Sequence, residues 1–275
     1  MKILSGKIIN EKIKSKLFRL ARNLKVTPSI VIVQIGNDSV SNIYISQKIK
    51  FAEAVGAKAS VIKFNEKISQ KKIIEEIKKI NSDKSVQGII VQLPIPQKYN
   101  KNEIIDAIDP AKDVDGLTSA NITKLLRNEE GGIVPATTRG IFELLDYYKI
   151  KIAGKNVVIL GRSNLVGRPT AIQFLNNDST VTICHSKTKN IKKVIASADI
   201  VVSAVGKPEF LNSNLFSSKQ IIIGVGISHN KNGKLVGDIK TSGLNAAAIT
   251  PVPGGIGPMT VACLFKNLFD SCKNI

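Results

Sequence analysis

The sequence predicts two α/β domains, each built on a mostly parallel sheet. Short runs of β-branched and aliphatic residues, such as 29–35 and 86–92, alternate with amphipathic segments of helical length. That alternation is typical of βαβ units on a parallel sheet. The Gly131-Gly132 pair separates two such series, and 275 residues suffice for two domains or one large one. We therefore expect one domain on either side of this break.

The chain is expected to open with a helix. The residues before position 25 are basic and amphipathic, as in a transit peptide, but Glu11 interrupts the positive charge. An ordinary first helix is the simpler interpretation, because apolar residues recur at helical spacing at Ile9, Ile13, Leu17, Leu20 and Leu24.

Three strands and two helices should follow the first helix. Gly56 suits a left-handed end for the first of these helices, and Ser69 suits the N-cap of the second. Function in parallel sheets collects at the carboxyl ends of strands, so the loops after Ile35 and Gln92 are the first places to examine. The expected order is strand 29–35, helix 39–55, strand 59–64, helix 69–80 and strand 86–92.

A glycine turn dominates the second half of the chain. The apolar run 156–160 reads as a buried strand that delivers the turn 161–167 to a helix, and Pro169 suits the first turn of that helix. Unpaired backbone N–H groups at a helix start can hold a pyrophosphate. As a G-x-G-x-x-G fingerprint the turn is imperfect, because Ser163 and Val166 stand at glycine positions.

The next strand indicates which dinucleotide the turn prefers. Strand 181–184 leads into His185-Ser186-Lys187, and positions 180–190 contain no carboxylate that could bind a ribose 2′-hydroxyl. Cationic and hydroxyl donors suit a 2′-phosphate instead, so the sequence predicts NADP rather than NAD. The alternative is that the lysines only cover a solvent-exposed face. The donors in question are Arg162, Ser186, Lys187 and Lys189.

The remaining elements complete the second domain. Helix 137–148 should link the halves, and strands 199–204, 220–225 and 246–250 should follow the glycine-turn unit. Glycine-containing loops at 206–208 and 224–226 leave two of these strands where a dinucleotide should lie. A final helix to about Cys272 carries an apolar side formed by Val261, Leu264, Leu268 and Cys272.

Composition limits the class of partner. Forty Lys and Arg against 21 Asp and Glu give a net charge of +19. The lysines are scattered along amphipathic segments such as 67–79, without a basic patch interleaved with aromatic residues, so we expect no nucleic-acid partner. A positive surface can also steer an anionic substrate.

The cysteine and histidine content bears on metal binding and on the redox compartment of the protein. Three cysteines at positions 184, 263 and 272 show no paired metal-ligand spacing, and only two histidines are present. We therefore expect no metal site and a reduced, cytoplasmic environment. No apolar run is long enough to span a bilayer, so we expect no membrane association.

Three features converge on the carboxyl ends of the first sheet. Tyr44 and Lys48 stand four residues apart and therefore on one helix face. Gln92 begins a turn stiffened by two prolines, and Asp115 closes a carboxylate-rich loop at 109–116. Each feature alone has a simpler structural interpretation as a helix surface, a strand end or a turn.

Together these motifs resemble one family. The chain contains Tyr44-x-x-x-Lys48, Gln92-Leu-Pro-Ile-Pro96, Lys112-Asp-Val-Asp-Gly116, Gly161-Arg-Ser-x-x-Val-Gly-x-Pro169 and Thr250-Pro-Val-Pro-Gly-Gly-Ile-Gly-Pro-Met-Thr260 in this order. It resembles the bifunctional methylenetetrahydrofolate dehydrogenase/methenyltetrahydrofolate cyclohydrolases, almost from end to end.

The resemblance implies two activities in a cleft between the domains. Methylenetetrahydrofolate gives hydride to NADP, and water then adds to the methenyl product to give 10-formyltetrahydrofolate, a step of one-carbon metabolism and purine biosynthesis. By position, Lys48 is the proton-transfer residue of the cyclohydrolase step and Tyr44 stacks on the folate. Gln92 orients Lys48 and tunes its basicity, and Asp115 hydrogen-bonds the pterin.

The resemblance also implies the binding residues and the assembly. The folate substrate, including polyglutamylated forms, is expected in a domain of residues 1–135 to which the segment 250–275 returns, and NADP in a Rossmann-like domain of residues 136–249. A cytoplasmic homodimer is implied. Besides the four residues above, the folate site includes Val91, Leu93, Pro253, Gly254, Gly255, Ile256 and Gly257. The cofactor site includes Gly161, Arg162, Ser163, Ser186 and Ile227.

The chain departs from the family pattern at four positions. Ala136 and Thr138 stand where Cys and Pro are usual, and Gly224 and Ser228 replace an Asp and an Asn that commonly flank Val-Gly-Ile. Gly224 and Ser228 bracket the nicotinamide side of the cofactor. A monofunctional cyclohydrolase with weak dehydrogenase activity is therefore the first alternative. Another two-domain NADP dehydrogenase, such as a shikimate-type enzyme, and a basic nucleic-acid-binding protein are the others.

Overall fold

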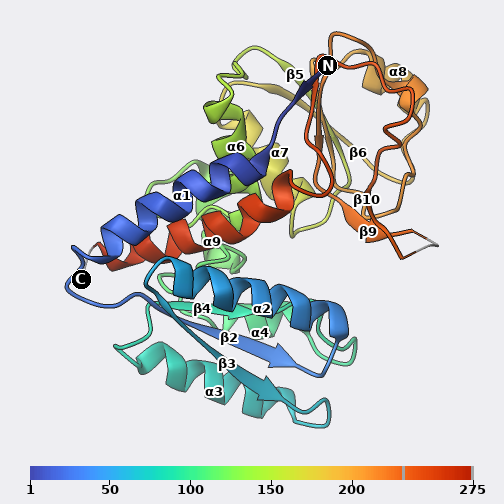
Figure 1. Cartoon of the computed structure of the whole chain (residues 1–275). Helices are drawn as coiled ribbons and strands as arrows, with labels where there is room; N and C mark the ends of the chain where they lie inside the picture. The colour runs from blue at the N-terminus through green and yellow to red at the C-terminus, as the bar shows by residue number, and fades with distance from the viewer. Residues whose placement is uncertain (231–232, 274–275) are drawn as a thin grey trace. The chain divides into compact units, whose positions relative to one another are not determined.

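The computed structural model describes residues 1–230 and 233–273, which form two compact units (Figure 1). One unit comprises Glu11–Ala136 and Val261–Ile275, and the other comprises Met1–Asn10 and Thr137–Thr260. We name them the three-stranded unit and the six-stranded unit after their main sheets. Residues 231–232 and 274–275, which the expected domains 136–249 and 250–275 include, lie outside the described residues.

The three-stranded unit contains a fully parallel sheet in the order β3-β2-β4. The register sets Ile30 of β2 opposite Ala59 of β3 and Gly88 of β4. All three predicted strands are confirmed to within two residues. Every residue of β4 is buried, as its apolar sequence predicts. The strands are β2 (Ser29–Ile35), β3 (Lys58–Phe64) and β4 (Gly88–Val91).

Helices cover both faces of this sheet (Figure 1). The predicted apolar stripe of α3 (Gln70–Ser82) is buried against β2 and β4, and Ser69 caps that helix as expected. The helix α2 (Ser39–Ala54) lies on the opposite face, with the Asp38 carboxylate accepting the Ser41 N–H at 2.7 Å. This cap fixes the start of the helix that carries two of the candidate residues.

The six-stranded unit contains a parallel sheet in the order β1-β11-β8-β7-β5-β6. The predicted strand 156–160 coincides with β5, and the other predicted strands of this half are also present. In chain order the strands are β1 (Lys2–Ile3), β5 (Asn156–Leu160), β6 (Thr180–Cys184), β7 (Ile200–Ser203), β8 (Ile221–Gly224) and β11 (Ala248–Ile249).

Helices and a small hairpin complete this unit. The helix α6 (Ala136–Tyr147) confirms the predicted helix 137–148, and α7 (Gly167–Leu175) follows the glycine turn. An antiparallel hairpin joins β9 (Ile227–His229) to β10 (Leu235–Gly237). The shorter elements are α8 (Ile191–Ala196) and the 3-10 turn η1 (Ser213–Leu215).

The boundaries of the units differ from the expected domains near both ends of the chain. The strand β1 pairs with β11, so the first residues belong to the six-stranded sheet rather than to the expected domain 1–135. Residues 250–260 also group with that unit. As a result, α1 (Gly6–Ala21) and α9 (Ile256–Cys272) each contribute to both units. A two-residue strand has too few positions to show a period in the sequence.

Two short helices follow β4 that the sequence interpretation did not include. These are α4 (Lys101–Asp106) and α5 (Ser119–Arg127), and they bracket the carboxylate-rich loop. Asn100 caps the first through its side chain, and Thr118 caps the second. Both caps are visible in the sequence as polar residues before a short apolar pattern, which was the available signal.

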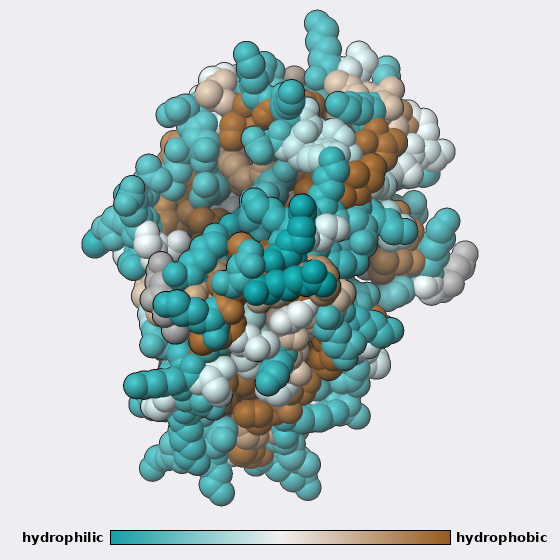
Figure 2. Space-filling model, turned by 60° about the vertical axis from the view of Figure 1, so that its left-hand side comes forward, coloured by the Kyte–Doolittle hydropathy of each residue, from teal (hydrophilic) through white to brown (hydrophobic). Residues whose placement is uncertain are grey.

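No helix in residues 1–230 and 233–273 is long and apolar enough to cross a membrane. The same residues contain no group of three His, Cys, Asp or Glu side chains arranged to hold a metal ion. Hydrophilic side chains cover most of the face drawn in Figure 2, with smaller apolar patches between them.

Candidate active site

A lysine and a glutamine meet at the carboxyl edge of the three-stranded sheet. Lys48 lies on α2, which follows β2, and Gln92 directly follows β4, the parallel neighbour of β2. The Lys48 Nζ donates to Gln92 Oε1 at 2.8 Å, and Gln92 Nε2 donates to the Leu93 carbonyl at 2.7 Å. Since an ammonium only donates and a carbonyl only accepts, these contacts fix the orientation of the buried Gln92 amide.

The charge of this lysine is destabilised where it lies. Burial lowers the pKa of Lys48 below its usual value, and the nearby Asp115 carboxylate partly opposes that shift. Burial raises the pKa of Asp115 to about 6, Lys48 opposes this shift, and Asp113 adds to it. Two ionisable groups whose pKa values are both displaced toward neutrality are characteristic of acid–base sites.

The loop that carries Asp115 is built around a second carboxylate that the sequence analysis did not single out. Asp113 is buried, and its Oδ1 accepts the Gly116 N–H at 3.0 Å. Its Oδ2 accepts the Thr118 N–H at 2.7 Å and the Asn121 side-chain amide at 3.0 Å. Asp113 therefore folds the turn, which leaves Asp115 as the carboxylate whose interaction partner is Lys48.

The remaining candidates of this unit lie beside the lysine–glutamine pair. Tyr44 is half-buried one helical turn before Lys48, on the same face of α2. Val91 is the buried last residue of β4, and the half-buried Leu93 follows Gln92. The structure thus brings Lys48, Gln92 and Asp115 together and places the other three at adjacent positions.

In the six-stranded unit, the glycine turn packs as tightly as its sequence indicates. Gly161 has a φ of +115°, and a Cβ there would lie 2.5 Å from the Ala204 carbonyl oxygen. A Cβ on Gly167 would overlap the Gly161 carbonyl, so the turn and the helix start require both glycines. The strand β5 therefore delivers its turn to α7 as predicted.

One expectation about this turn is wrong. The N–H groups at the start of α7 were expected to be unpaired, but Ser163 Oγ accepts from Val166 and Gly167 at 3.2 and 3.4 Å. The Ser163 carbonyl accepts the Arg168 N–H at 3.0 Å. A serine at the second glycine position supplies an oxygen that a glycine lacks, so this turn caps its own helix.

The strand β6 ends in a turn that exposes the predicted phosphate donors. Thr188 Oγ1 accepts the His185 N–H at 2.9 Å, and His185 Nδ1 accepts the Lys187 N–H at 3.1 Å. These contacts fix the turn, whereas Ser186 and Lys187 remain exposed. Arg162, on the neighbouring strand exit, is also exposed. The donor set therefore fits an anionic group such as a 2′-phosphate.

The loop after β7 is organised by Asp238, a residue that the sequence analysis missed. Its fully buried carboxylate accepts from Ser203 Oγ and from the Val205 N–H, both at 2.8 Å, and from the Lys207 N–H at 3.0 Å. A Cβ on Gly226 would overlap this carboxylate. Asp238 thus holds together the two glycine loops in which a dinucleotide was expected.

The Pro-Gly loop 251–257 is fixed from both ends within the same unit. Thr250 Oγ1 accepts the Gly224 N–H at 2.8 Å, and the Lys7 N–H donates to the Gly254 carbonyl at 3.1 Å. A Cβ on Gly257 would lie 3.1 Å from Ile227 Cδ1. Predicted substrate residues therefore adjoin a predicted cofactor residue. The substrate residues of this loop are Pro253, Gly254, Gly255, Ile256 and Gly257.

Comparison with known proteins agrees with both halves of this description. The family model described as tetrahydrofolate dehydrogenase/cyclohydrolase, catalytic domain, matches residues 4–115. The model of the NAD(P)-binding domain of the same family matches residues 135–275. The Bifunctional protein FolD of Ligilactobacillus salivarius is 44% identical over 273 residues, which are 98% of this chain and 95% of that protein.

Solved structures agree in fold as well as in sequence. The bifunctional enzyme FolD, methylenetetrahydrofolate dehydrogenase/cyclohydrolase, from Campylobacter jejuni is 38% identical with a TM-score of 0.98, covering 100% of this chain and 99% of that one. The Trypanosoma brucei FolD complexed with NADP cofactor and inhibitor is 33% identical with a TM-score of 0.93, covering 99% and 97%. This chain belongs to the tetrahydrofolate dehydrogenase/cyclohydrolase family.

Proposed function

We propose that the protein oxidises 5,10-methylenetetrahydrofolate with NADP and hydrolyses the product to 10-formyltetrahydrofolate. In the first step a hydride leaves the methylene carbon, which becomes the methenyl cation as NADP becomes NADPH. In the second step water adds to that cation, one proton is released and a ring C–N bond opens. The observation that carries this proposal is the 2.8 Å contact between Lys48 Nζ and Gln92 Oε1 in a chain of this family.

Lys48 is the group that we assign to proton transfer in the hydrolysis. A lysine acts as a base near neutrality only when its pKa is lowered, and burial lowers the pKa of Lys48. A cationic methenyl group beside it would lower that pKa further. Gln92 aims the amine through its oxygen, and Asp115 binds the pterin. Tyr44 provides a flat apolar surface for stacking.

NADP supplies a hydride acceptor when it is bound, and the six-stranded unit has the features to hold it. The glycine turn 161–167 has no room for side chains at its two glycines. Arg162 and Ser186 are exposed donors at the neighbouring ends of β5 and β6, with no carboxylate between positions 180 and 190. The chain's own contribution to hydride transfer is binding and orientation.

The test is an assay with methylenetetrahydrofolate and either NADP or NAD, following reduced nucleotide together with the methenyl and 10-formyl products. NADP-dependent turnover through to the formyl product is the expected result. If added methenyltetrahydrofolate were hydrolysed while neither nucleotide was reduced, the monofunctional alternative would replace this proposal. Gly224 would then be the first position to change, because a Cβ there makes only ordinary contacts, at 3.7 Å from Thr250 Oγ1.

We expect Ser186→Asp to shift the cofactor preference from NADP toward NAD. A carboxylate at the exposed end of β6 repels a 2′-phosphate and accepts from a 2′-hydroxyl. The KM for NAD divided by the KM for NADP should fall by roughly 100-fold, which corresponds to a change of about 2.7 kcal/mol in the relative binding free energy of the two nucleotides. Ser197→Asp, an exposed serine after α8 in the same unit, is the charge-matched control and should leave the ratio unchanged.

We also propose a cytoplasmic homodimer that acts on polyglutamylated folates and does not bind nucleic acid. Buried free thiols at all three cysteines fit a reducing compartment. The net charge of +19 suits attraction of an anionic polyglutamate tail, an effect that salt should weaken. Sedimentation analysis tests the dimer. A nucleic-acid affinity that falls steeply with salt and survives changes at Lys48 would contradict the last point.

A further inference from the structure

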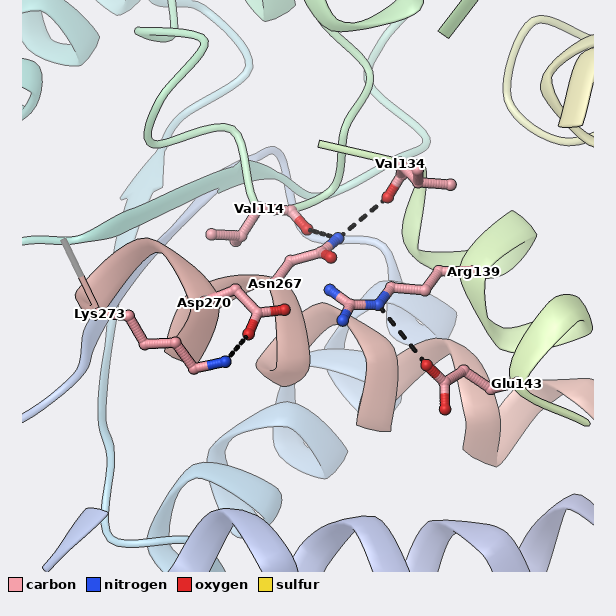
Figure 3. A network of polar contacts seen from close by, with 7 residues as sticks. All are labelled: Val114, Val134, Arg139, Glu143, Asn267, Asp270 and Lys273. Carbon is pink, nitrogen blue, oxygen red and sulfur yellow. Dashed lines mark hydrogen bonds and ion pairs between the residues drawn. The ribbon is translucent and has the colours of Figure 1, made fainter. Parts of the chain in front are cut away.

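A buried asparagine on the last helix holds the backbone on both sides of the Asp115 turn. Asn267 is 3% exposed, and its side-chain nitrogen donates to the Val114 carbonyl at 2.8 Å and to the Val134 carbonyl at 3.1 Å (Figure 3). Val114 immediately precedes Asp115. One amide group therefore joins two segments that lie 20 positions apart in the sequence.

The same two segments are tied together on the far side of Asp115. The Ala136 N–H donates to the Asp115 carbonyl at 3.1 Å. Gly116 has a φ of +72°, and a Cβ there would lie 2.6 Å from the Ile133 carbonyl oxygen. The backbone of Asp115 is thus held between the Asn267 bridge before it and this close packing after it. Displacement of the 133–136 segment would displace Asp115 with it.

We propose that Asn267 is a positioning residue for folate binding, acting through the carbonyls of Val114 and Val134 to aim Asp115 at the pterin. This inference rests on the proposed role of Asp115 as the pterin-binding residue. Asn267 itself does not touch the reacting atoms in this assignment. Its contribution is to keep the Asp115 carboxylate at a fixed place relative to Lys48.

The chemistry of the bridge explains why an amide is needed. Val114 is fully buried and Val134 is half-buried, so each carbonyl needs a protein donor, and a single NH₂ group provides both. Leucine has the same number of side-chain heavy atoms and the same branching but leaves both carbonyls without this donor. Aspartate places a carboxylate against two carbonyl oxygens. Serine has one hydroxyl hydrogen and can serve only one carbonyl at a time.

The structure offers a matched control for loss of such a bridge. Gln220 is also buried, and its side-chain nitrogen donates to two backbone carbonyls, those of Ile195 and Ala198, at 2.6 and 3.0 Å. These residues lie in the six-stranded unit and include none of the candidate site residues. Replacing either amide removes a comparable pair of donated bonds, and replacing Gln220 also removes the bond that its oxygen accepts from the Ser217 N–H at 2.9 Å. Only the Asn267 pair borders Asp115.

The experiment compares Asn267→Leu with Gln220→Leu in the full-length enzyme. Measurements are the folate KM and kcat of the cyclohydrolase reaction from pH 5 to 9, NADP binding and the midpoint of urea unfolding. We expect Asn267→Leu to raise the folate KM roughly tenfold and to move the acidic limb of the pH profile, with NADP affinity unchanged. Gln220→Leu should lower stability without raising the folate KM.

Further outcomes separate this inference from the proposed function. If Asn267→Leu does not fold, Asn267→Ser is measured in its place, and its folate KM is expected to rise above the wild-type value by less than tenfold. An unchanged folate KM and pH profile in a folded Asn267 variant would overturn the inference. The inference would also be overturned if Asp115→Asn had the same folate KM as the wild type. A wild-type protein inactive in both assays would instead refute the proposed function.

Discussion

Lys48→Met is expected to abolish most cyclohydrolase activity while leaving substantial dehydrogenase activity. Methionine keeps an unbranched apolar chain of similar length but removes the group assigned to proton transfer. General acid–base catalysis contributes typically 10²–10⁴-fold, so a cyclohydrolase loss on the order of 10³-fold is expected. Hydride transfer needs no proton transfer from Lys48. The dehydrogenase activity should therefore fall by less than about tenfold, because only the positioning of the folate is weakened.

The matched control is Lys50→Met. Lys50 lies two positions farther along α2, is exposed, and faces away from Lys48. Lys50→Met should leave both activities close to wild type, because Lys50 does not face the site and an exposed substitution of this kind usually changes the free energy of unfolding by less than about 0.5 kcal/mol. Both activities are measured on each variant, with methylenetetrahydrofolate for the first and methenyltetrahydrofolate for the second. Equal loss of both activities in Lys48→Met would refute the division of roles.

The parts of the fold with long apolar periods were predictable from the sequence. Strand 29–35 is a nearly continuous apolar run, and the buried stripe of α3 at Ile73, Ile77 and Ile80 repeats a helical spacing. The two-residue β1 and the six-residue α8 contain too few positions to repeat any spacing. Their presence depends on tertiary pairing, which acts over distances in sequence that local patterns do not record.

In the candidate site, too, some residues could be predicted from the sequence and others could not. Lys48, Gln92 and Asp115 lie within recognisable motifs, and the structure brings these three side chains together. Asp113, Asp238 and Asn267 hold the backbone of the loops instead. Their partners are mostly main-chain groups, in the case of Asn267 and Val114 separated by 153 positions. Any residue offers a main-chain N–H or carbonyl, so such contacts leave no sequence signal.

Asp115→Asn is expected to weaken folate binding and at the same time to stabilise the protein at neutral pH. Loss of a charge-assisted hydrogen bond costs about 1.5–3 kcal/mol, so kcat/KM for the folate should fall between about 10- and 150-fold in both reactions. The stability gain follows from burial, which raises the pKa of Asp115 to about 6 from an ordinary value of 3.8. Ionised Asp115 is therefore less stable in the folded protein than in the unfolded chain.

The sign of the pH dependence gives this prediction a second readout. Below pH 3.8 Asp115 is protonated in both states and contributes nothing, and between pH 3.8 and about 6 the wild type progressively loses stability relative to the variant. Above that range the difference in the free energy of unfolding should be constant, on the order of 3 kcal/mol. Urea unfolding at pH 4 and pH 7.5 measures this difference between the wild type and Asp115→Asn. Asp109→Asn, in the same loop, is the control.

Lys48 provides an independent check on the same substitution. The Asp115 carboxylate raises the pKa of Lys48 against the effect of burial, so its removal should lower that pKa further. Any remaining cyclohydrolase activity of Asp115→Asn should consequently persist to lower pH than in the wild type, because Lys48 stays neutral there. If the variant gained no stability at pH 7.5 and the pH profile of its cyclohydrolase activity did not move, Asp115 would not be the electrostatic partner of Lys48. Its assignment to the folate would then lose its physical basis.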